Sequence, residues 1–345
     1  MQIISLTSKH YSLWDEYVKK HNQASPYHLL AYKNTLETTY KLTCPYLLAI
    51  ENDSVVGVLP IAIFKTIFGK KSYCSLPYCD IGGALTNSRK ITNKLLSSAE
   101  KQMAEQNIKQ WQLRDSASLP LKPEAEIIEG SKVRMILALP DSRDELWSGF
   151  KAKVRSQVRK AEKNKLTCEV NQDSSLSEFY DVYCKNMRAL GSPVHTFTWF
   201  EGINNHYQKN VHIVIVKLNE QAIAGGMIIN SKQVCSVPWA SSLREFNHTN
   251  ANMLLYFNML NIAIEQGCNY FDFGRSSFGQ NTFKFKKQWG AQALPLAWQT
   301  RPYSNISNPA ATLSTYRNII AKLWSFLPLA ATNYIGSKVR RYISL

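Results

Sequence analysis

The sequence predicts an α/β fold with mixed sheets, arranged as two tandem copies of one domain followed by a C-terminal helical tail. Three observations lead to this prediction. With 345 residues the chain is long for a single domain. Its 45% hydrophobic and 19% charged residues are the balance of a globular protein with a sizeable core. The same order of strand-like and helix-like segments also occurs twice along the chain.

The first copy opens with two apolar runs, residues 46–50 and 55–64, which a polar turn joins into a predicted β-hairpin. A Ser-Leu-Pro-Tyr block follows at 75–78. An amphipathic pattern predicts a helix over 88–106, and the run 111–114 predicts a short strand. The copy therefore combines a hairpin with a helix that crosses over to a further strand.

The second copy repeats these segments in the same order. Its hairpin is predicted from the apolar runs 213–216 and 222–229, and a Ser-Val-Pro-Trp block follows at 236–239. A helix is expected over 250–266 and a strand over 270–275.

The spacing also agrees between the copies. Arg114 lies 39 residues after Ser75, and Arg275 lies 39 residues after Ser236. A matched block and a matched arginine at one spacing favour a duplication. Antiparallel hairpins combined with helical crossovers predict a mixed sheet in each copy.

We place the boundary between the copies near 130–140, after proline and glycine residues that punctuate the chain. The predicted domains are 1–137 and 138–302, and a basic amphipathic tail is predicted over 303–345.

Three features predict a cytoplasmic protein without a metal site. The first residues form no charged-then-apolar leader, and no apolar run approaches the ~20 residues of a spanning helix. The seven cysteines are scattered and form no C-x-x-C pair, which predicts reduced thiols and no structural zinc.

The net charge of +16 is concentrated in three segments. Residues 150–165 carry seven basic residues against one acid, three lysines lie between 284 and 287, and no acid follows Arg301. This distribution predicts a polyanionic partner or a membrane surface.

A capping box at 142–145 predicts the start of the helix that carries the first basic segment. Its apolar residues fall within an arc of roughly 80° on a helical wheel: Trp147, Phe150, Val154, Val158 and Ala161. A basic stripe lies beside them: Lys151, Arg155, Arg159 and Lys163. Two interpretations follow, a solvated surface or a face that binds an anion and so offsets the repulsion of like charges. The near absence of acids favours the second, with Lys153, Arg155 and Arg159 as binding residues.

Two runs near the end of the second copy carry a resemblance. Residues 271–276 read Phe-Asp-Phe-Gly-Arg-Ser, and 283–290 read Phe-Lys-Phe-Lys-Lys-Gln-Trp-Gly. With the blocks at 75–83, 153–160 and 186–194, they resemble FemAB-related proteins of the GNAT acyltransferase superfamily, with a BioF2-like acetyltransferase domain. The set is most similar to the subgroup associated with exosortase (PEP-CTERM) and exopolysaccharide gene clusters.

The resemblance implies two GNAT-like domains side by side and transfer of an acyl or aminoacyl group. The acceptor it implies is an amine or hydroxyl of a cell-envelope or exopolysaccharide precursor bearing a diphosphate. No metal or redox cofactor is implied, since the donor is aminoacyl-tRNA or acyl-CoA. Members that use acetyl-CoA carry a glycine-containing loop for its pyrophosphate, whereas the corresponding stretch 239–252 has no glycine. This departure disfavours a CoA donor.

Asp272 and Arg275 are the predicted catalytic residues. Strand alternation separates Asp272 from its neighbours Phe271 and Phe273, and a carboxylate at a strand end can orient or deprotonate an attacking amine. The alternative is a buried structural aspartate, bound by backbone amides or by Arg275. Arg275 suits a clamp on phosphate or carboxylate.

Four more residues are predicted to bind substrate or phosphate. Lys284 and Lys287 lie in a run expected to be a strand, where the alternative is an exposed lysine edge. Trp239 is expected to line the crevice between the domains or to belong to the core. Asn252 lies at an expected helix start, where capping is the alternative.

The tail supports two interpretations. It is either a helix docked on the second domain or a segment that binds anionic lipid headgroups and holds the protein peripherally at the inner membrane. The partners expected for the transferase are an anionic donor, with tRNA as one candidate, and a diphosphate-bearing acceptor. Two alternatives to the envelope transferase stay open for the whole chain: an acyl-CoA-dependent N-acetyltransferase, and a non-catalytic scaffold or polyanion-binding protein.

Overall fold

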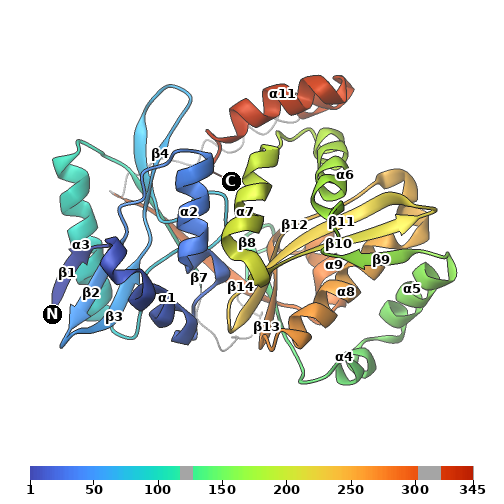
Figure 1. Ribbon diagram of the computed structural model, residues 1–345, viewed down its shortest axis with the longest axis horizontal. Helices are drawn as coiled ribbons and strands as arrows, with labels where there is room; N and C mark the ends of the chain where they lie inside the picture. Colours follow the sequence, from blue (N-terminus) through green and yellow to red (C-terminus); the bar gives the residue numbers. More distant parts are fainter. Residues whose placement is uncertain (117–126, 302–319, 345) are drawn as a thin grey trace.

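A ten-stranded mixed sheet runs through the molecule, and a four-stranded antiparallel sheet lies at its N-terminal end (Figure 1). The structure is a computed structural model and describes residues 1–116, 127–301 and 320–344. The strand order of the long sheet is β4-β5-β7-β14-β8-β13-β12-β11-β10-β9, and that of the short sheet is β1-β2-β3-β6.

The first half supplies the short sheet and one end of the long one. Its strands are β1 (Gln2–Ser5), β2 (Leu47–Glu51), β3 (Ser54–Leu59), β4 (Ala62–Lys65), β5 (Lys71–Cys74), β6 (Leu85–Thr86) and β7 (Trp111–Ser116). Its helices are α1 (Tyr11–Lys20), α2 (Leu30–Thr39) and α3 (Arg89–Glu105), with 3-10 turns at Ser8–His10 and Pro26–His28.

The second half supplies the rest of the long sheet. Its strands are β8 (Lys132–Ala138), β9 (Thr167–Val170), β10 (Val211–Leu218), β11 (Gln221–Asn230), β12 (Val234–Ser242), β13 (Tyr270–Ser277) and β14 (Gln292–Arg301). Its helices are α4 (Arg143–Gly149), α5 (Ala152–Lys163), α6 (Ser175–Ala189), α7 (Phe197–Tyr207), α8 (Ala251–Glu265) and α9 (Asn281–Gln288). Short 3-10 helices cover Gln208–Asn210 and Arg244–Thr249, and α11 (Leu329–Arg340) lies near the C-terminus.

The predicted internal repeat is visible in the strand pairing. In the first half β2 and β3 form the hairpin, and α3 connects β5 to the parallel strand β7. In the second half β10 and β11 form the hairpin, and α8 connects β12 to the parallel strand β13. The copies differ because the predicted run 55–64 divides at Pro60, which has no N–H for a sheet. β3 therefore stays in the short sheet and β4 enters the long one.

Strands β8 and β14 join the two halves. β14 pairs with β7 of the first half along one edge and with β8 along the other, and β8 in turn pairs with β13. The predicted division at 137/138 falls inside β8, and the domain bounds stay a prediction.

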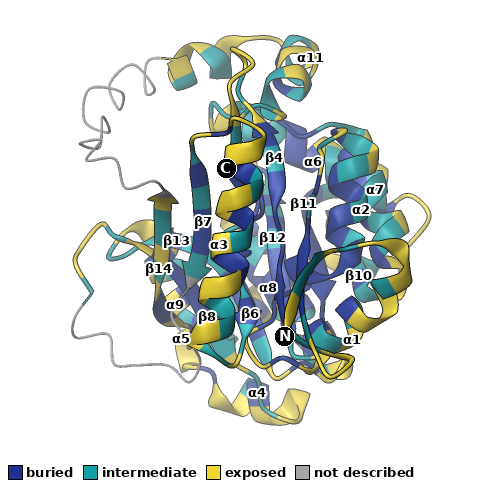
Figure 2. Cartoon of the chain, turned by 90° about the vertical axis from the view of Figure 1, so that its left-hand side faces the viewer, coloured by how far each residue is buried: buried dark blue, intermediate teal, exposed yellow. Residues whose placement is uncertain are grey.

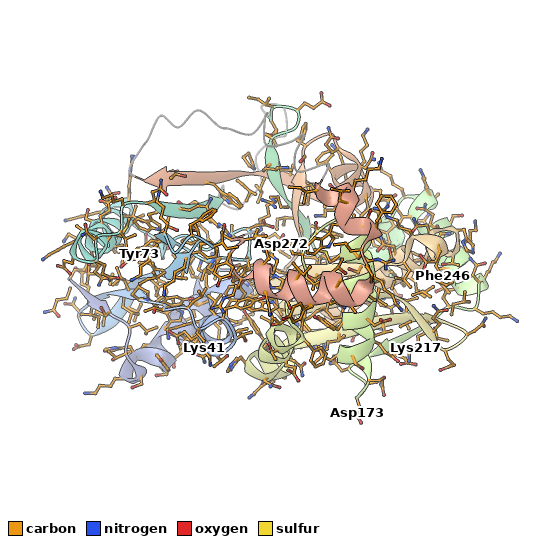
Figure 3. All side chains as sticks on the ribbon, turned by 90° about the horizontal axis from the view of Figure 1, so that it is seen from above. Lys41, Tyr73, Asp173, Lys217, Phe246 and Asp272 are labelled. Carbon is orange, nitrogen blue, oxygen red and sulfur yellow. The ribbon has the colours of Figure 1, made fainter. Side chains whose placement is uncertain are left out.

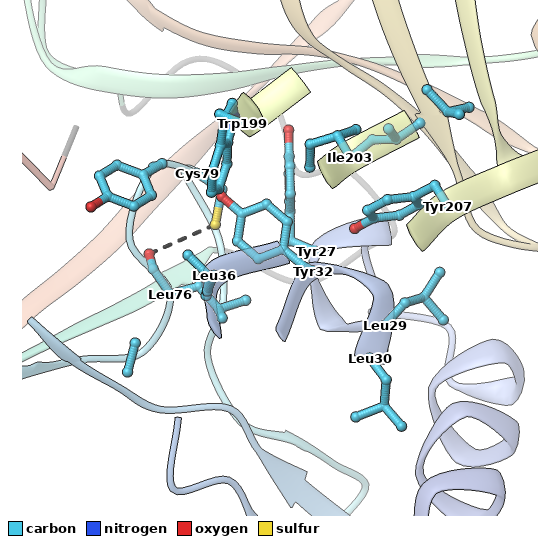
Figure 4. Packing of buried hydrophobic residues seen from close by; sticks show 14 of the residues in the cluster. Tyr27, Leu29, Leu30, Tyr32, Leu36, Leu76, Cys79, Trp199, Ile203 and Tyr207 are labelled. Carbon is cyan, nitrogen blue, oxygen red and sulfur yellow. Dashed lines mark hydrogen bonds between the residues drawn. The ribbon is translucent and has the colours of Figure 1, made fainter. Parts of the chain in front are cut away.

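One apolar core crosses the junction between the halves. It contains Tyr32 and Leu36 of α2 as well as Trp199 of α7 and Trp239 of β12. The rings of Tyr32 and Trp199 meet edge to face with centroids 5.9 Å apart, and Figure 4 shows this packing. A shared core of this kind disfavours large motions of one half against the other.

The described part of the C-terminal tail docks across the same junction. Tyr78 Oη donates to the main-chain oxygen of Arg341 over 2.7 Å, and Arg114 Nη1 donates to that of Ser344 over 3.1 Å. The described tail is therefore docked on the protein, with α11 against α6 and the residues after α11 against the first half. The start of the predicted tail, 303–319, lies outside the described residues, and lipid binding by the tail stays a prediction. None of the helices in the described ranges has the length and apolar character needed to cross a bilayer.

The predicted basic helix is interrupted. Ser142 caps α4 as expected, since its Oγ accepts from Glu145 N over 3.2 Å. A single helix through this segment is wrong, however, because Phe150 has an extended ψ of 144° and α5 begins only at Ala152.

Candidate active site

A cavity of about 340 Å³ lies at the junction of the two halves. Its lining comes from three parts of the chain and includes Tyr27, Tyr78 and Asp80 of the first half, Asn186, His195, Trp239, Arg275 and Lys286 of the second, and Arg340 of α11. The expected crevice between the copies is therefore present, and two residues predicted for the site, Arg275 and Trp239, line it.

Arg275 is paired with Asp80 across the junction. Its backbone N donates to Asp80 Oδ2 over 3.0 Å, and its Nε lies 3.5 Å from Oδ1. Burial raises the pKa of Asp80, although the charge of Arg275 opposes this shift. Trp298 lies under the Arg275 guanidinium, 5.4 Å from ring centroid to Cζ, and donates from Nε1 to Asp80 O. Both charged groups are therefore held in place before any ligand binds.

Lys286 lies in the cavity wall and is only 8% exposed. Its Nζ donates to the main-chain oxygen of Arg275 over 2.9 Å. Burial lowers the pKa of Lys286 to about 8, although Asp80 and Asp272 oppose the shift. A substantial fraction of this side chain is therefore neutral in mildly alkaline solution, while the ammonium predominates at pH 7.

Asp272 is 3% exposed and is not among the residues that line the cavity, although its neighbour Phe273 is. Figure 3 shows it near the middle of the long axis of the molecule. Its Oδ2 pairs with Arg134 Nε over 2.9 Å, and its Oδ1 accepts from Gly274 N over 2.8 Å. Of the two partners that the structural alternative named, a backbone amide is present, whereas Arg275 is not, because β8 brings Arg134 opposite β13 and Arg275 turns to Asp80. The backbone turns between Asp272 and Arg275 at Gly274, whose φ of 72° lies in the left-handed region that glycine adopts readily.

His195 adds a neutral group to the lining. Its Nδ1 is 2.7 Å from Tyr40 Oη, and its ring stacks on Trp199 with centroids 5.0 Å apart. Burial lowers the pKa of His195, and the charge of Arg340 acts in the same direction. Its Nε2 is buried without a hydrogen-bond partner among the described residues. An unsatisfied polar atom at a cavity wall suits a hydrogen bond to a ligand.

Residues 148–287 match the sequence profile described as Acetyltransferase (GNAT) domain. The chain contains a GNAT acetyltransferase domain. The matched stretch includes all the cavity residues named above from the second half, but neither the first half nor α11.

Solved structures extend the likeness to both halves. The crystal structure of FemX has a TM-score of 0.68 at 15% identity and covers 85% of this chain and 95% of that one. L-PGS from Bacillus licheniformis has a TM-score of 0.54 at 10% identity, covering 92% and 98%. A tandem GNAT protein from the clavulanic acid biosynthesis pathway, without AcCoA, has 0.53 at 10%, covering 87% and 97%. These likenesses concern the fold, and the predicted class of two tandem GNAT-like domains is confirmed. No curated protein sequence matches the chain.

Residues 283–288 of the run 283–290 belong to the helix α9 rather than to the predicted strand. In α9, Phe283 and Lys286 are buried on one side, whereas Lys284 and Lys287 are exposed. The Lys287 ammonium lies 5.3 Å from the Phe283 ring centroid. Because the segment is helical, Lys286 faces inward, although the predicted site contained only Lys284 and Lys287.

The basic residues of α5 lie apart from the cavity lining. Lys153 and Arg159 are exposed, and Arg159 stacks 5.3 Å over the ring of Trp147. Arg155 Nη1 donates to the main-chain oxygens of Ser148 and Phe150, where α4 ends. Arg155 therefore stabilises the break between the two helices, and any binding role for these three basic residues stays a prediction.

Asn252 is the second residue of α8, while the N-cap position belongs to Asn250 with φ 61°. The expectation that Asn252 caps the helix is therefore wrong, and its role toward a substrate stays a prediction. The stretch 239–252, which lacks the glycines of a pyrophosphate-binding loop, contains the 3-10 helix Arg244–Thr249.

Sequence reasoning missed Asp80, Lys286, His195 and Arg340 as site residues. Asp80 lies within the noted block at 75–83, and a helical wheel for 281–288 places Lys286 three residues after Phe283. Those two signals were present in the sequence. His195 also had a signal, since it directly follows the noted block at 186–194. Arg340 has no comparable pattern around it, because only the docking of the tail brings it to the cavity.

Proposed function

We propose that the protein is an acyl- or aminoacyltransferase whose acceptor binds in the junction cavity. The observation that carries the proposal is Lys286, a nearly buried cation in the cavity wall of a GNAT domain, with Arg275 beside it. Burial of a charge costs free energy, and perturbed groups of this kind cluster at functional sites.

The chemistry requires stabilisation of a negative oxygen. When the acceptor nitrogen or oxygen bonds to the donor carbonyl carbon, the carbonyl oxygen becomes an oxyanion. The bond from that carbon to the donor oxygen or sulfur then breaks, and the proton of the acceptor ends on the leaving group. In the proposal Lys286 and Arg275 stabilise the oxyanion as fixed cations in a partly desolvated site.

Two carboxylates have separate roles in this scheme. Asp80 lines the cavity and is the group that takes up or passes on the proton of the acceptor. Asp272, predicted from the sequence as catalytic, is a positioning residue: through Gly274 N it fixes the turn that carries Arg275. This division follows from exposure, since the Asp272 side chain is 4% exposed and the Asp80 side chain is 21% exposed.

The charge of the lining favours an anionic acceptor. Arg275, Lys286 and Arg340 face the cavity with Asp80, and guanidinium groups bind phosphate in a bidentate manner. A cell-envelope or exopolysaccharide precursor that bears a diphosphate fits this lining. That acceptor agrees with the resemblance to the exosortase-associated FemAB subgroup and with a cytoplasmic protein at the inner membrane.

For the donor we propose aminoacyl-tRNA ahead of acyl-CoA. The stretch 239–252 lacks the glycines of a pyrophosphate loop, and the exposed Lys153 and Arg159 of α5 are available to RNA phosphates. The acyl-CoA-dependent enzyme and the non-catalytic scaffold are the alternatives that the experiment must separate.

Two measurements test the proposal. Mass spectrometry of envelope polymer and lipid-linked precursors, from cells with and without the protein, is expected to reveal one missing acyl or aminoacyl substituent. Thermal unfolding of the purified chain with either CoA or aminoacyl-tRNA identifies the donor by the rise in Tm that binding causes. An unchanged polymer together with no response to either donor would overturn the transferase in favour of a scaffold.

A further inference from the structure

Two surface segments far apart in the chain expose large apolar side chains. One is the turn between β4 and β5, where Phe68 is 95% exposed and Ile67 61%. The other comprises the two C-terminal helical segments, where Phe326 is 77% exposed and Leu323 63%. Apart from Ile128, all large apolar side chains exposed by more than 60% within the described ranges lie in these two places. Figures 1 and 2 show the hairpin turn and α11 at the same edge of the molecule.

The two segments are tied together at Tyr78. Phe64 of β4 packs against the Tyr78 ring with centroids 6.3 Å apart. Tyr78 also holds the end of the tail, since its N donates to Ser344 O and its Oη donates to Arg341 O, both over 2.7 Å. The hairpin and the tail therefore form one preformed surface, which we call the hairpin–tail surface.

The charge on this surface has one sign. No acid occurs between Asp53 and Asp80 or within 320–344. The hairpin turn is flanked by three exposed lysines: Lys65, Lys70 and Lys71. The described tail carries four basic residues: Lys322, Lys338, Arg340 and Arg341.

We propose that the hairpin–tail surface binds the anionic face of a phospholipid bilayer. Phe68 and Phe326 insert among the acyl chains near the headgroups, and the surrounding basic residues meet lipid phosphates. Exposed apolar patches mark interaction sites in general. Exposed aromatic side chains beside an acid-free basic rim fit an anionic lipid surface, because such a surface offers acyl chains directly below its phosphates.

The surface adjoins the junction cavity. Tyr78 and Arg340 line the cavity, and the Arg340 guanidinium lies 5.4 Å over the Tyr78 ring. A diphosphate-bearing acceptor anchored in the bilayer by a lipid can therefore enter the cavity without leaving the membrane. This last step rests on the proposed function, whereas membrane binding itself does not.

The test uses the full chain and two kinds of vesicle. One kind is phosphatidylcholine alone, and the other contains about a third of the anionic lipid phosphatidylglycerol. We expect flotation with the anionic vesicles, weakening as salt screens the charges. The variant Phe68→Ser/Phe326→Ser is expected to lower the vesicle partition coefficient about tenfold or more, because two apolar insertions are lost. Ile128→Ser is the matched control, since Ile128 is 80% exposed but lies outside the surface, and it is expected to bind as wild type does.

Several results would overturn the proposal: no flotation with anionic vesicles, equal flotation with neutral ones, or equal losses in the Phe68/Phe326 and Ile128 variants. Because all three positions are exposed, near-ultraviolet circular dichroism is expected to stay unchanged and so excludes misfolding. Flotation does not depend on transfer, so a failed transferase assay with intact flotation overturns the proposed function alone. If a protein covers this surface instead, that protein should stay bound to the chain at high salt in the absence of lipid. This result, together with no flotation, would overturn the lipid proposal.

Discussion

Lys286 Nζ donates a hydrogen bond to the main-chain oxygen of Arg275 over 2.9 Å, and this contact joins α9 to the end of β13. The amide of the same Arg275 is bound by Asp80 from the first half. Lys286 of α9 and Asp80 of the loop after β5 thus bind the main chain of one residue of β13, the carbonyl and the amide of Arg275. The proposed active site therefore combines residues of the matched stretch 148–287 with Asp80, which lies outside that stretch.

The first prediction concerns the Lys286 charge. Lys286→Met keeps the length of the side chain but removes the ammonium, and we expect kcat to fall about a hundredfold to a thousandfold, as when an oxyanion donor is lost. Lys284→Met, on the exposed side of the same helix, is the control and should keep nearly full activity. Single-turnover transfer rates measure both, and equal losses in the two variants would contradict a role specific to Lys286.

The second prediction follows from the lowered pKa of Lys286. Between pH of about 8 and the ordinary lysine value near 10.5, the unfolded chain keeps this proton while the folded chain loses it. Stability of the wild type should therefore rise with pH through this window, and the contribution should be flat below about pH 8. Urea denaturation measures the unfolding free energy of wild type and of Lys286→Met. Over the same window, the unfolding free energy of the wild type should rise relative to that of the variant. A difference independent of pH would show that the lysine is not buried as a titrating group.

Much of the fold could be predicted because it depends on local patterns. The apolar runs that became β10, β11 and β13, and the amphipathic segment that became α3, carry their periodicity within a few residues. The errors arose where the pattern was short or interrupted. The run around Lys286 alternates as a strand does, yet Phe283, Lys286 and Trp289 also repeat at helical spacing, and tertiary burial decided in favour of the helix.

The site was less predictable because its pairs are distant in sequence. Asp80 and Arg275 are 195 residues apart, and Asp272 takes Arg134, 138 residues away, as its partner. No spacing rule within one segment encodes such contacts. Arg275 and Trp239 were identified because the resemblance and the repeat pointed to their segments, whereas Arg340 depends on how the tail docks.

The third prediction separates the two carboxylates. Asp272→Ala leaves the Arg134 guanidinium buried and unpaired, so the unfolding free energy should fall by about 3–5 kcal/mol. Asp80→Asn keeps the size of a more exposed side chain, and we expect a loss of kcat with a much smaller change in stability. Chemical denaturation and transfer assays on both variants make the comparison. An Asp272 variant with full stability and no activity would reverse the two assigned roles.

The fourth prediction concerns Arg340 at the cavity wall. Arg340→Gln removes one charge-assisted contact to an anionic acceptor, and KM for that acceptor should rise about tenfold or more while kcat changes little. Lys338→Gln is the matched control, because Lys338 belongs to the same helix but is not among the cavity residues. If the two variants raise KM equally, the general charge of the tail is responsible, and Arg340 has no direct contact.

The last prediction tests how α11 is held on the protein. A Cβ at Gly336 would lie 2.9 Å from Val194 N and 3.3 Å from Pro193 Cα, so the backbone of α11 can approach only because this residue is glycine. Gly336→Val should displace α11, lower the unfolding free energy by about 1–3 kcal/mol as overpacking does, and open the cavity wall that carries Arg340. Ala330→Val, at an exposed position of the same helix, should leave both stability and KM unchanged. Hydrogen exchange of the α11 amides gives the direct measurement, with faster exchange expected in Gly336→Val alone, and unchanged protection there would contradict the close docking of the helix.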